Sequence, residues 1–239
     1  MAKIKKHLLL RTTGIAIAFA LVGVACSTGQ EAPGAQRDNA MESPKETPAG
    51  QAATGIDTDA AQLTQGLTDL LDSHVYLAGI AVEQAVLTED PNSPQFKAAA
   101  AALDQNSQDL AAAIESVYGA DAADQFLELW RKHIGFFVDY TVGGITDDQQ
   151  AQRKAKQALD RYRQDFGAFI DSATNGELPK DAVAGALQEH VNSLLKTIDS
   201  VIEGKGNPFM SLYDASHMHM PGTASALAGG IIAANPDKF

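Results

Sequence analysis

The sequence predicts an all-α protein, an antiparallel bundle of about six helices arranged as three helical-hairpin repeats. From about residue 57 onward, apolar residues recur at the three- and four-residue steps of an amphipathic helix. Alanine runs are frequent and only 6% of the 239 residues are aromatic, so residues that favour strands are scarce. A chain of this length fits one such domain together with shorter N-terminal segments.

Residues 1–25 have the organisation of a secretory signal peptide. Positively charged residues precede the apolar run 14–25, which is too short to span a membrane stably. The residues before Cys26, the only cysteine, resemble the bacterial lipobox, in which the cysteine becomes an acylated N-terminus. We therefore expect a lipoprotein anchored to the extracytoplasmic face of the cell membrane by acyl chains, such as palmitate, on Cys26. Simple secretion with a free thiol is the alternative.

Residues 26–56 are expected to form a flexible tether behind the lipidated cysteine. They are rich in Ser, Gly, Pro, Gln, Ala and Glu and contain almost no large apolar side chain. Such a segment cannot bury enough surface to offset the entropy lost on ordering. The helical bundle is therefore assigned to residues 57–239.

Each predicted helix is delimited by residues that favour helix ends. Pro94 stands just inside the start of the second helix, and Gly119 follows its end. Thr146 and Gln149 form a capping-box pattern at the start of the fourth helix, which ends near 175–176. The six helices are expected at about 58–85, 94–117, 121–141, 146–175, 180–203 and 207–234.

Two similarities between segments predict the hairpin repeat. The sequence from residue 103, LDQNSQDLAAAI, is similar to the sequence from residue 159, LDRYRQDFGAFI. The first, third and fifth helices each carry a histidine in a similar setting, and a period near 57 residues relates the segments. We expect the three hairpins to close into one bundle, with an open solenoid as the alternative.

The histidines on these helices are the candidate site. His74, His133 and His190 each lie on an apolar stripe, at the same position of the first, third and fifth helices. Imidazoles that converge inside a bundle commonly bind a metal, and they are unfavourably buried without a partner. Histidines packed in the core with no ligand are the alternative.

The last helix adds further candidate ligands in the run SHMHMPG. Met210, Tyr213, His217 and Met220 follow one another at steps of three or four and so share one predicted helix face. Because Pro221 has no amide hydrogen to donate to the His217 carbonyl, we expect a kink there.

Copper is the expected metal, with zinc or non-covalent haem as alternatives. Thioether ligands select copper, histidines alone suit zinc equally well, and the haem attachment motif CxxCH is missing. No Glu-x-x-His motif of a di-iron centre occurs. The predicted ligands are His74, His133, His190, His217, Met220 and Met210. The side chains that are candidates to hydrogen-bond to the imidazoles are Asn106, Tyr162 and Tyr213, with packing in the core as the alternative for Asn106 and Tyr162.

Composition and motifs argue against two other classes of function. The formal net charge of −12 disfavours nucleic acid as a partner, because binding a polyanion requires a basic face. No Ser/His/Asp or Cys/His nucleophile pattern and no glycine-rich phosphate loop occurs, so we do not expect an enzyme. A non-catalytic accessory subunit of a membrane complex, respiratory or transport, is the main alternative to metal handling or sensing.

Several segments between residues 60 and 235 resemble a little-characterised secreted helical-bundle domain of Gram-positive bacteria. The matching runs are SHVYLAG, LDQNSQDLAAAIESVYG, LWRKHIGFFVDYT, LQEHVNSL and SHMHMPG. That domain is sometimes joined to a copper-amine-oxidase N-terminal-like module. The resemblance implies an extracytoplasmic helical domain and favours copper. It implies no amine oxidase activity, because the large catalytic domain of those enzymes has no counterpart in these residues.

Overall fold

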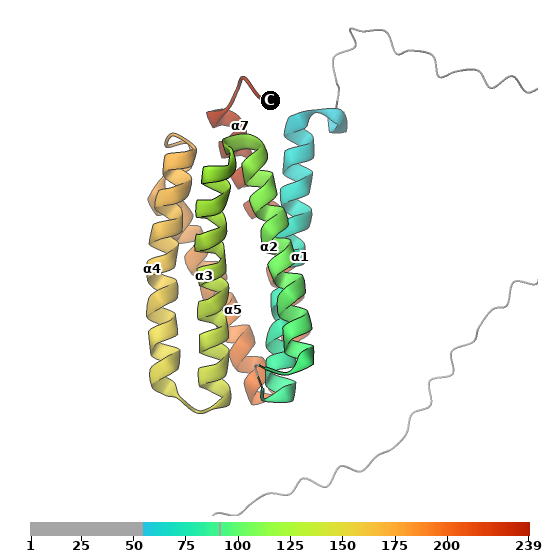
Figure 1. Cartoon of the computed structure of the whole chain (residues 1–239), viewed down its shortest axis with the longest axis vertical. Helices are drawn as coiled ribbons and strands as arrows, with labels where there is room; N and C mark the ends of the chain where they lie inside the picture. Colours follow the sequence, from blue (N-terminus) through green and yellow to red (C-terminus); the bar gives the residue numbers. More distant parts are fainter. Residues whose placement is uncertain (1–54, 91) are drawn as a thin grey trace, which may run out of the picture. The chain divides into compact units, whose positions relative to one another are not determined.

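The structure is a computed structural model that describes residues 55–90 and 92–239 (Figure 1). The signal peptide predicted at 1–25, the lipidated Cys26 and nearly all of the tether predicted at 26–56 lie outside the described residues. Within the described residues every regular element is a helix, which confirms the predicted all-α class. None of these helices is long and apolar enough to cross a membrane.

The five long helices lie within a few residues of the predicted ranges. They are α1 (Asp59–Thr88), α2 (Pro94–Tyr118), α3 (Ala120–Ile145), α4 (Gln149–Ala173) and α5 (Lys180–Glu203). A short 3-10 turn, η1 (Gly55–Asp57), precedes them. The last predicted helix is divided into α6 (Pro208–Tyr213), a π-helical turn η2 (Asp214–His219) and α7 (Met220–Ala234).

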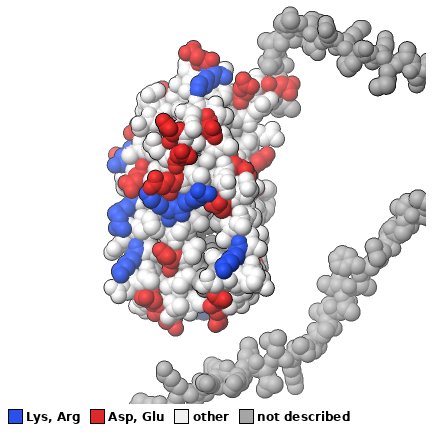
Figure 2. All heavy atoms as spheres, in the orientation of Figure 1, with Lys and Arg blue, Asp and Glu red and all other residues white. Residues whose placement is uncertain are grey.

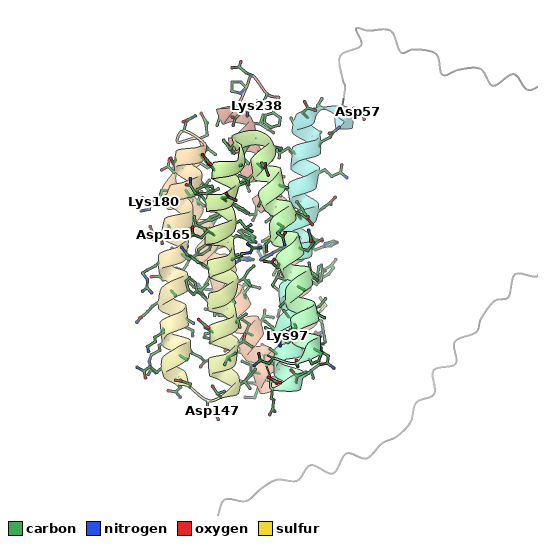
Figure 3. All side chains as sticks on the ribbon, in the orientation of Figure 1. Asp57, Lys97, Asp147, Asp165, Lys180 and Lys238 are labelled. Carbon is green, nitrogen blue, oxygen red and sulfur yellow. The ribbon has the colours of Figure 1, made fainter. Side chains whose placement is uncertain are left out.

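Successive long helices run in opposite directions along the bundle (Figure 1). In Figure 3, Asp57 and Lys238 lie at one end of the bundle, whereas Lys97 and Asp147 lie at the other. α1, α3 and α5 contact one another, α2 packs on α1 and α3, and α4 packs on α3 and α5. α6 and η2 contact both α1 and α5, and α7 lies along α1. Because the last segment packs on the first helix, the helices close into a bundle; the hairpin repeat itself stays a prediction.

The start of α4 differs from the predicted capping box. Asp148 caps this helix, since its Oδ1 accepts hydrogen bonds from the amides of Gln150 at 2.9 Å and Ala151 at 3.0 Å. Thr146 instead donates to the carbonyl of Val142 at 2.8 Å. The prediction was wrong because α3 continues past the Gly143–Gly144 pair to Ile145, which moves the cap two residues along the chain.

The core is largely aromatic and branched aliphatic, and the surface carries charges of both signs. Phe126, Trp130 and Phe166 pack together, with ring centroids 5.2 Å and 5.9 Å from Trp130. On the face drawn in Figure 2, acidic and basic side chains are intermixed rather than gathered into a basic surface. The surface ion pair between Arg131 and Asp104, at 2.7 Å, is one example.

Candidate functional site: a histidine-lined cavity

A cavity of about 260 Å³ lies inside the bundle, between side chains of α1 to α5 and α7. His74, His133 and His190 all line it, so the structure brings together three of the predicted ligands. The rest of the wall is mainly apolar and includes Leu67, Leu71, Leu110, Ile114, Phe126 and Phe166. A second cavity of about 60 Å³ shares His74 and His133, so these two imidazoles separate two apolar spaces.

The imidazole of His74 is oriented by Asn106 on the neighbouring helix α2. The Asn106 amide nitrogen donates to the backbone carbonyl of Leu70 at 3.0 Å. This bond directs the amide oxygen toward His74, where it lies 3.2 Å from Nδ1. An amide oxygen only accepts, so Nδ1 carries the hydrogen and Nε2 keeps its lone pair. His74 is therefore held in the tautomer that can bind a metal through Nε2.

His133 is buried among aromatic rings. Its ring stacks on Tyr162 with centroids 4.9 Å apart, and Trp130 meets it edge-on at 4.5 Å. The centroid of the His74 ring lies 5.5 Å away. The expected hydrogen bond from Tyr162 to an imidazole does not form, because stacked rings direct the phenol oxygen away from the imidazole nitrogens. Tyr162 Oη, His133 Nδ1 and Trp130 Nε1 are buried and have no hydrogen-bond partner among the described residues.

The surroundings keep these imidazoles neutral at physiological pH. Burial, with a smaller contribution from His190, lowers the pKa of His74 from 6.5 to about 4. Burial also lowers the pKa of His133 well below its ordinary value, and its neighbours His74 and His190 add to the effect. The pKa of partly buried His190 is lowered to about 4 by burial and by His219. Neutral imidazole is the form that binds a metal.

The last helical segment does not present its predicted ligands on one face. Met220 is buried and lines the cavity. Met210 is exposed and does not line it. His217 is also exposed, with its Nδ1 3.8 Å from a carboxylate oxygen of Asp72. Tyr213 is exposed as well, and its ring lies 5.0 Å from that of His217. The structure therefore brings Met220 to the buried histidines and leaves the other three residues at the surface.

The π-helical turn η2 separates Met220 from the other three residues, whereas Met210 and Tyr213 precede the turn and are exposed because α6 buries Leu212. The prediction used about 3.6 residues per turn throughout, whereas a π turn takes one extra residue and rotates all later side chains by about 100°. The buried side chains here are Leu212, Ala215, Ser216 and Met220, and none of Met210, Tyr213 and His217 is among them. Pro221, the second residue after η2, lacks the amide hydrogen that a regular helix requires at that position.

His219 is a neighbour of the site that the sequence pattern does not single out. It is exposed, yet it is close enough to His190 for the two charges to interact and lower the pKa of His190. The only available signal was its position directly before Met220, two residues after His217.

The distances between the candidate side chains in this structure limit how many of them can bind one metal ion. Within the described residues, no three side chains of His, Cys, Asp or Glu lie close enough together to share one ion. A site made from these positions therefore takes two imidazoles, His74 and His133, and completes its coordination with a thioether or a non-protein ligand.

Comparison with known proteins adds no assignment: no family model, no curated protein and no solved structure matches this chain.

Proposed function

We propose that the chain is a lipid-anchored extracytoplasmic protein that binds a transition metal, preferably copper, for metal handling or sensing. The observation that carries this proposal is the pair of buried imidazoles of His74 and His133, whose ring centroids lie 5.5 Å apart at one cavity. Met220 lines the same cavity and is the candidate to complete the site with its thioether, whereas His190 lines the cavity but does not lie close enough to both other imidazoles to share one ion with them.

The energetics of these imidazoles support a bound ion. An imidazole nitrogen buried without a partner costs free energy, because its hydrogen bonds to water are lost. Depressed pKa values mean that protons compete little with a metal near neutral pH. Asn106 holds the Nδ1 hydrogen of His74 and so leaves Nε2 as the donor atom. These are properties of a preorganised ligand.

Met220 favours copper over zinc. Thioether sulfur is a soft ligand that selects copper, mainly Cu(I), whereas zinc prefers thiolate, imidazole and carboxylate. Met220 lines the histidine cavity and is 5% exposed, so its sulfur is available to a buried ion rather than to one from solvent. Met210 and His217, exposed and away from the cavity, are left out of the proposed site.

Titration of metal-stripped protein tests the proposal. Cu(I) and Zn(II) are titrated against competing chelators into the wild type and into His74→Gln, His133→Gln and Met220→Leu, with His217→Gln as the exposed control. We expect one tight Cu(I) site that both cavity histidine variants lose, that Met220→Leu weakens more for Cu(I) than for Zn(II), and that the control retains.

Equal binding by all variants would contradict the site, as would no binding by a folded wild type. Thermal unfolding of the wild type with and without one equivalent of Cu(I) gives a result that does not depend on variants, because a ligand that binds only the native state raises the melting temperature.

A further inference from the structure

We propose that the 260 Å³ cavity binds one linear hydrocarbon chain of a lipid-like molecule, whose polar end stays at the surface between α5 and α7. Such a ligand is distinct from the metal ion, because it occupies the part of the cavity that extends away from the histidines. The length, the wall and the mouth of the cavity each support this assignment.

The size and the wall of the cavity suit an apolar organic ligand. Protein interiors are closely packed, and about 10–15 Å³ of such space already holds one water molecule. An apolar cavity of about 150 Å³ in another protein stays free of water and binds benzene, so 260 Å³ accepts a larger molecule. The far end of the cavity, away from the histidines, is formed by Leu67, Ile114, Phe126, Ile170, Val183 and Leu227.

The cavity is elongated along the bundle, with the histidines at one end. From the level of the histidines and Met220, its wall extends over residues 67–74 of α1, 126–133 of α3, 182–190 of α5 and 220–227 of α7. α7 runs opposite to the other three helices, toward the end of the bundle where Figure 3 labels Lys238. At 1.5 Å per residue, these four stretches surround a column about 10–12 Å long.

A column of this length suits a chain rather than a compact molecule. An extended chain of roughly eight to ten carbon atoms, with carbon–carbon bonds of about 1.5 Å, has the same length. Among the described residues that line the cavity there is no Lys, Arg, Asp or Glu. A charged head group inside would therefore lose its hydration without gaining a partner, so the polar end of the ligand stays outside.

The mouth of the cavity lies between α5 and α7. Four small side chains line the cavity and are also exposed at the surface, namely Ala182 and Ala186 on α5 and Thr223 and Ala226 on α7. Each of these two helices packs on α1. The sequence of α7 contains no charged residue, so an apolar chain that passes between the helices displaces no ion pair of α7. The chain can thus enter from the side and leave its polar end in water.

A series of linear alcohols from hexanol to dodecanol tests the chemistry and the length of the site. A protein from Gly50 to Phe239 is used because this compact unit contains all described core residues. Calorimetry is performed with a chelator present, so that binding does not depend on a metal. Trp130, the only tryptophan, lines the cavity, so its fluorescence reports occupancy.

We expect the affinity to rise about fourfold with each added methylene group and to level off when the chain exceeds the column. Val183→Phe fills part of the far end, so the affinity should level off at a shorter chain. Ala226→Phe at the mouth should prevent decanol from binding. The adjacent Ser225→Phe is the matched control, because Ser225 is exposed and does not line the cavity, and it should bind decanol as the wild type does.

Phosphatidylcholine vesicles distinguish a membrane lipid from a free amphiphile as the source of the chain. After incubation with vesicles, the protein is repurified and its lipids are extracted. Phosphatidylcholine retained by the wild type and lost in Ala226→Phe supports a chain that is still part of a membrane lipid. Decanol binding without retained phosphatidylcholine supports a free amphiphile.

No binding of any alcohol to the folded wild type would overturn the inference. An affinity that keeps rising up to dodecanol in the wild type and in Val183→Phe alike would also overturn it, because adsorption to the surface has no length limit. Either result leaves the Cu(I) titration unaffected, so the two proposals fail separately.

Discussion

The amide of Asn106 on α2 holds the imidazole of His74 on α1, with 3.2 Å between Oδ1 and Nδ1. The same amide donates to the carbonyl of Leu70, one turn before His74, at 3.0 Å. One buried side chain therefore joins two helices and sets which nitrogen of His74 carries the hydrogen. Both partners are buried, at 4% and 5% exposure, so water does not replace the bond.

Replacing Asn106 by leucine should weaken both the fold and the metal site. The Nδ1 hydrogen of His74 would lose its acceptor, which costs about 1–3 kcal/mol of unfolding free energy. Loss of the group that orients a metal-bound histidine lowers metal affinity by about 10–100-fold. Urea unfolding and Cu(I) competition measure the two effects.

Ser107→Ala is the matched control for Asn106→Leu. Ser107 is the adjacent residue, is equally buried and donates only to the carbonyl of Leu103 in its own helix. It should leave Cu(I) affinity unchanged. An equal loss of affinity in both variants would mean that Asn106 acts through helix stability alone.

The metal-free protein should lose stability as the pH falls from 6.5 toward 4. The pKa of His74 is about 4 in the folded protein against 6.5 as its ordinary value, so the unfolded chain binds the proton first. His74 alone accounts for a loss of about 3 kcal/mol over this window, and His190 acts in the same direction. Urea unfolding at several pH values measures how the free energy of unfolding changes with pH.

The variant His74→Gln should show a flatter stability profile between pH 6.5 and pH 4, whereas exposed His217→Gln should parallel the wild type. Unchanged stability of the metal-free wild type between pH 7 and pH 5 would contradict neutral burial of the histidines.

The helices and three of the site histidines were predictable because their determinants are local. Pro94 and the repeated apolar steps place α2 correctly, and His74, His133 and His190 follow from their positions on apolar stripes. The sequence singles out Asn106 as a candidate hydrogen-bond partner of an imidazole, but it does not specify that the imidazole is that of His74.

The remaining features depend on tertiary structure and could not be predicted. The π turn before Pro221 turns Met220 away from the face of His217, and the one extra residue in such a turn leaves no signature in a 3.6-residue pattern. The cavity depends on how side chains of six helical segments fill the interior, which no single segment determines. Trp130 illustrates this: its sequence position predicts core packing, but not an unpartnered indole nitrogen.

Two glycines provide a test of the helix packing between α4 and α5. A methyl group at Gly167 would lie 2.6 Å from the backbone carbonyl oxygen of Lys180, so Gly167→Ala should destabilise the protein by about 1–3 kcal/mol. Gly185 on α5 has open space, and Gly185→Ala should stabilise by about 0.5–1 kcal/mol through helix propensity. Thermal unfolding of the two variants measures both changes in stability. Equal effects of Gly167→Ala and Gly185→Ala would show that α4 and α5 do not pack as closely as described.

The proposed lipid anchor predicts where the full chain is found in a bacterial host. Cys26→Ser should move the protein from the membrane fraction to the soluble extracytoplasmic fraction, because acyl chains can no longer be attached. The neighbouring Ser27→Ala should remain with the membrane. Membrane association that persists in Cys26→Ser would point to a protein partner in the membrane instead.

Elemental analysis of the protein from Gly50 to Phe239, purified without chelator and accompanied by an absorption spectrum, tests the central claim most directly. We predict near-stoichiometric copper that is absent from His74→Gln/His133→Gln and retained in His217→Gln. Iron with a Soret band would instead assign the centre to non-covalent haem. A folded, metal-free and colourless protein that also refuses added Cu(I), Cu(II) and Zn(II) would contradict the metal site.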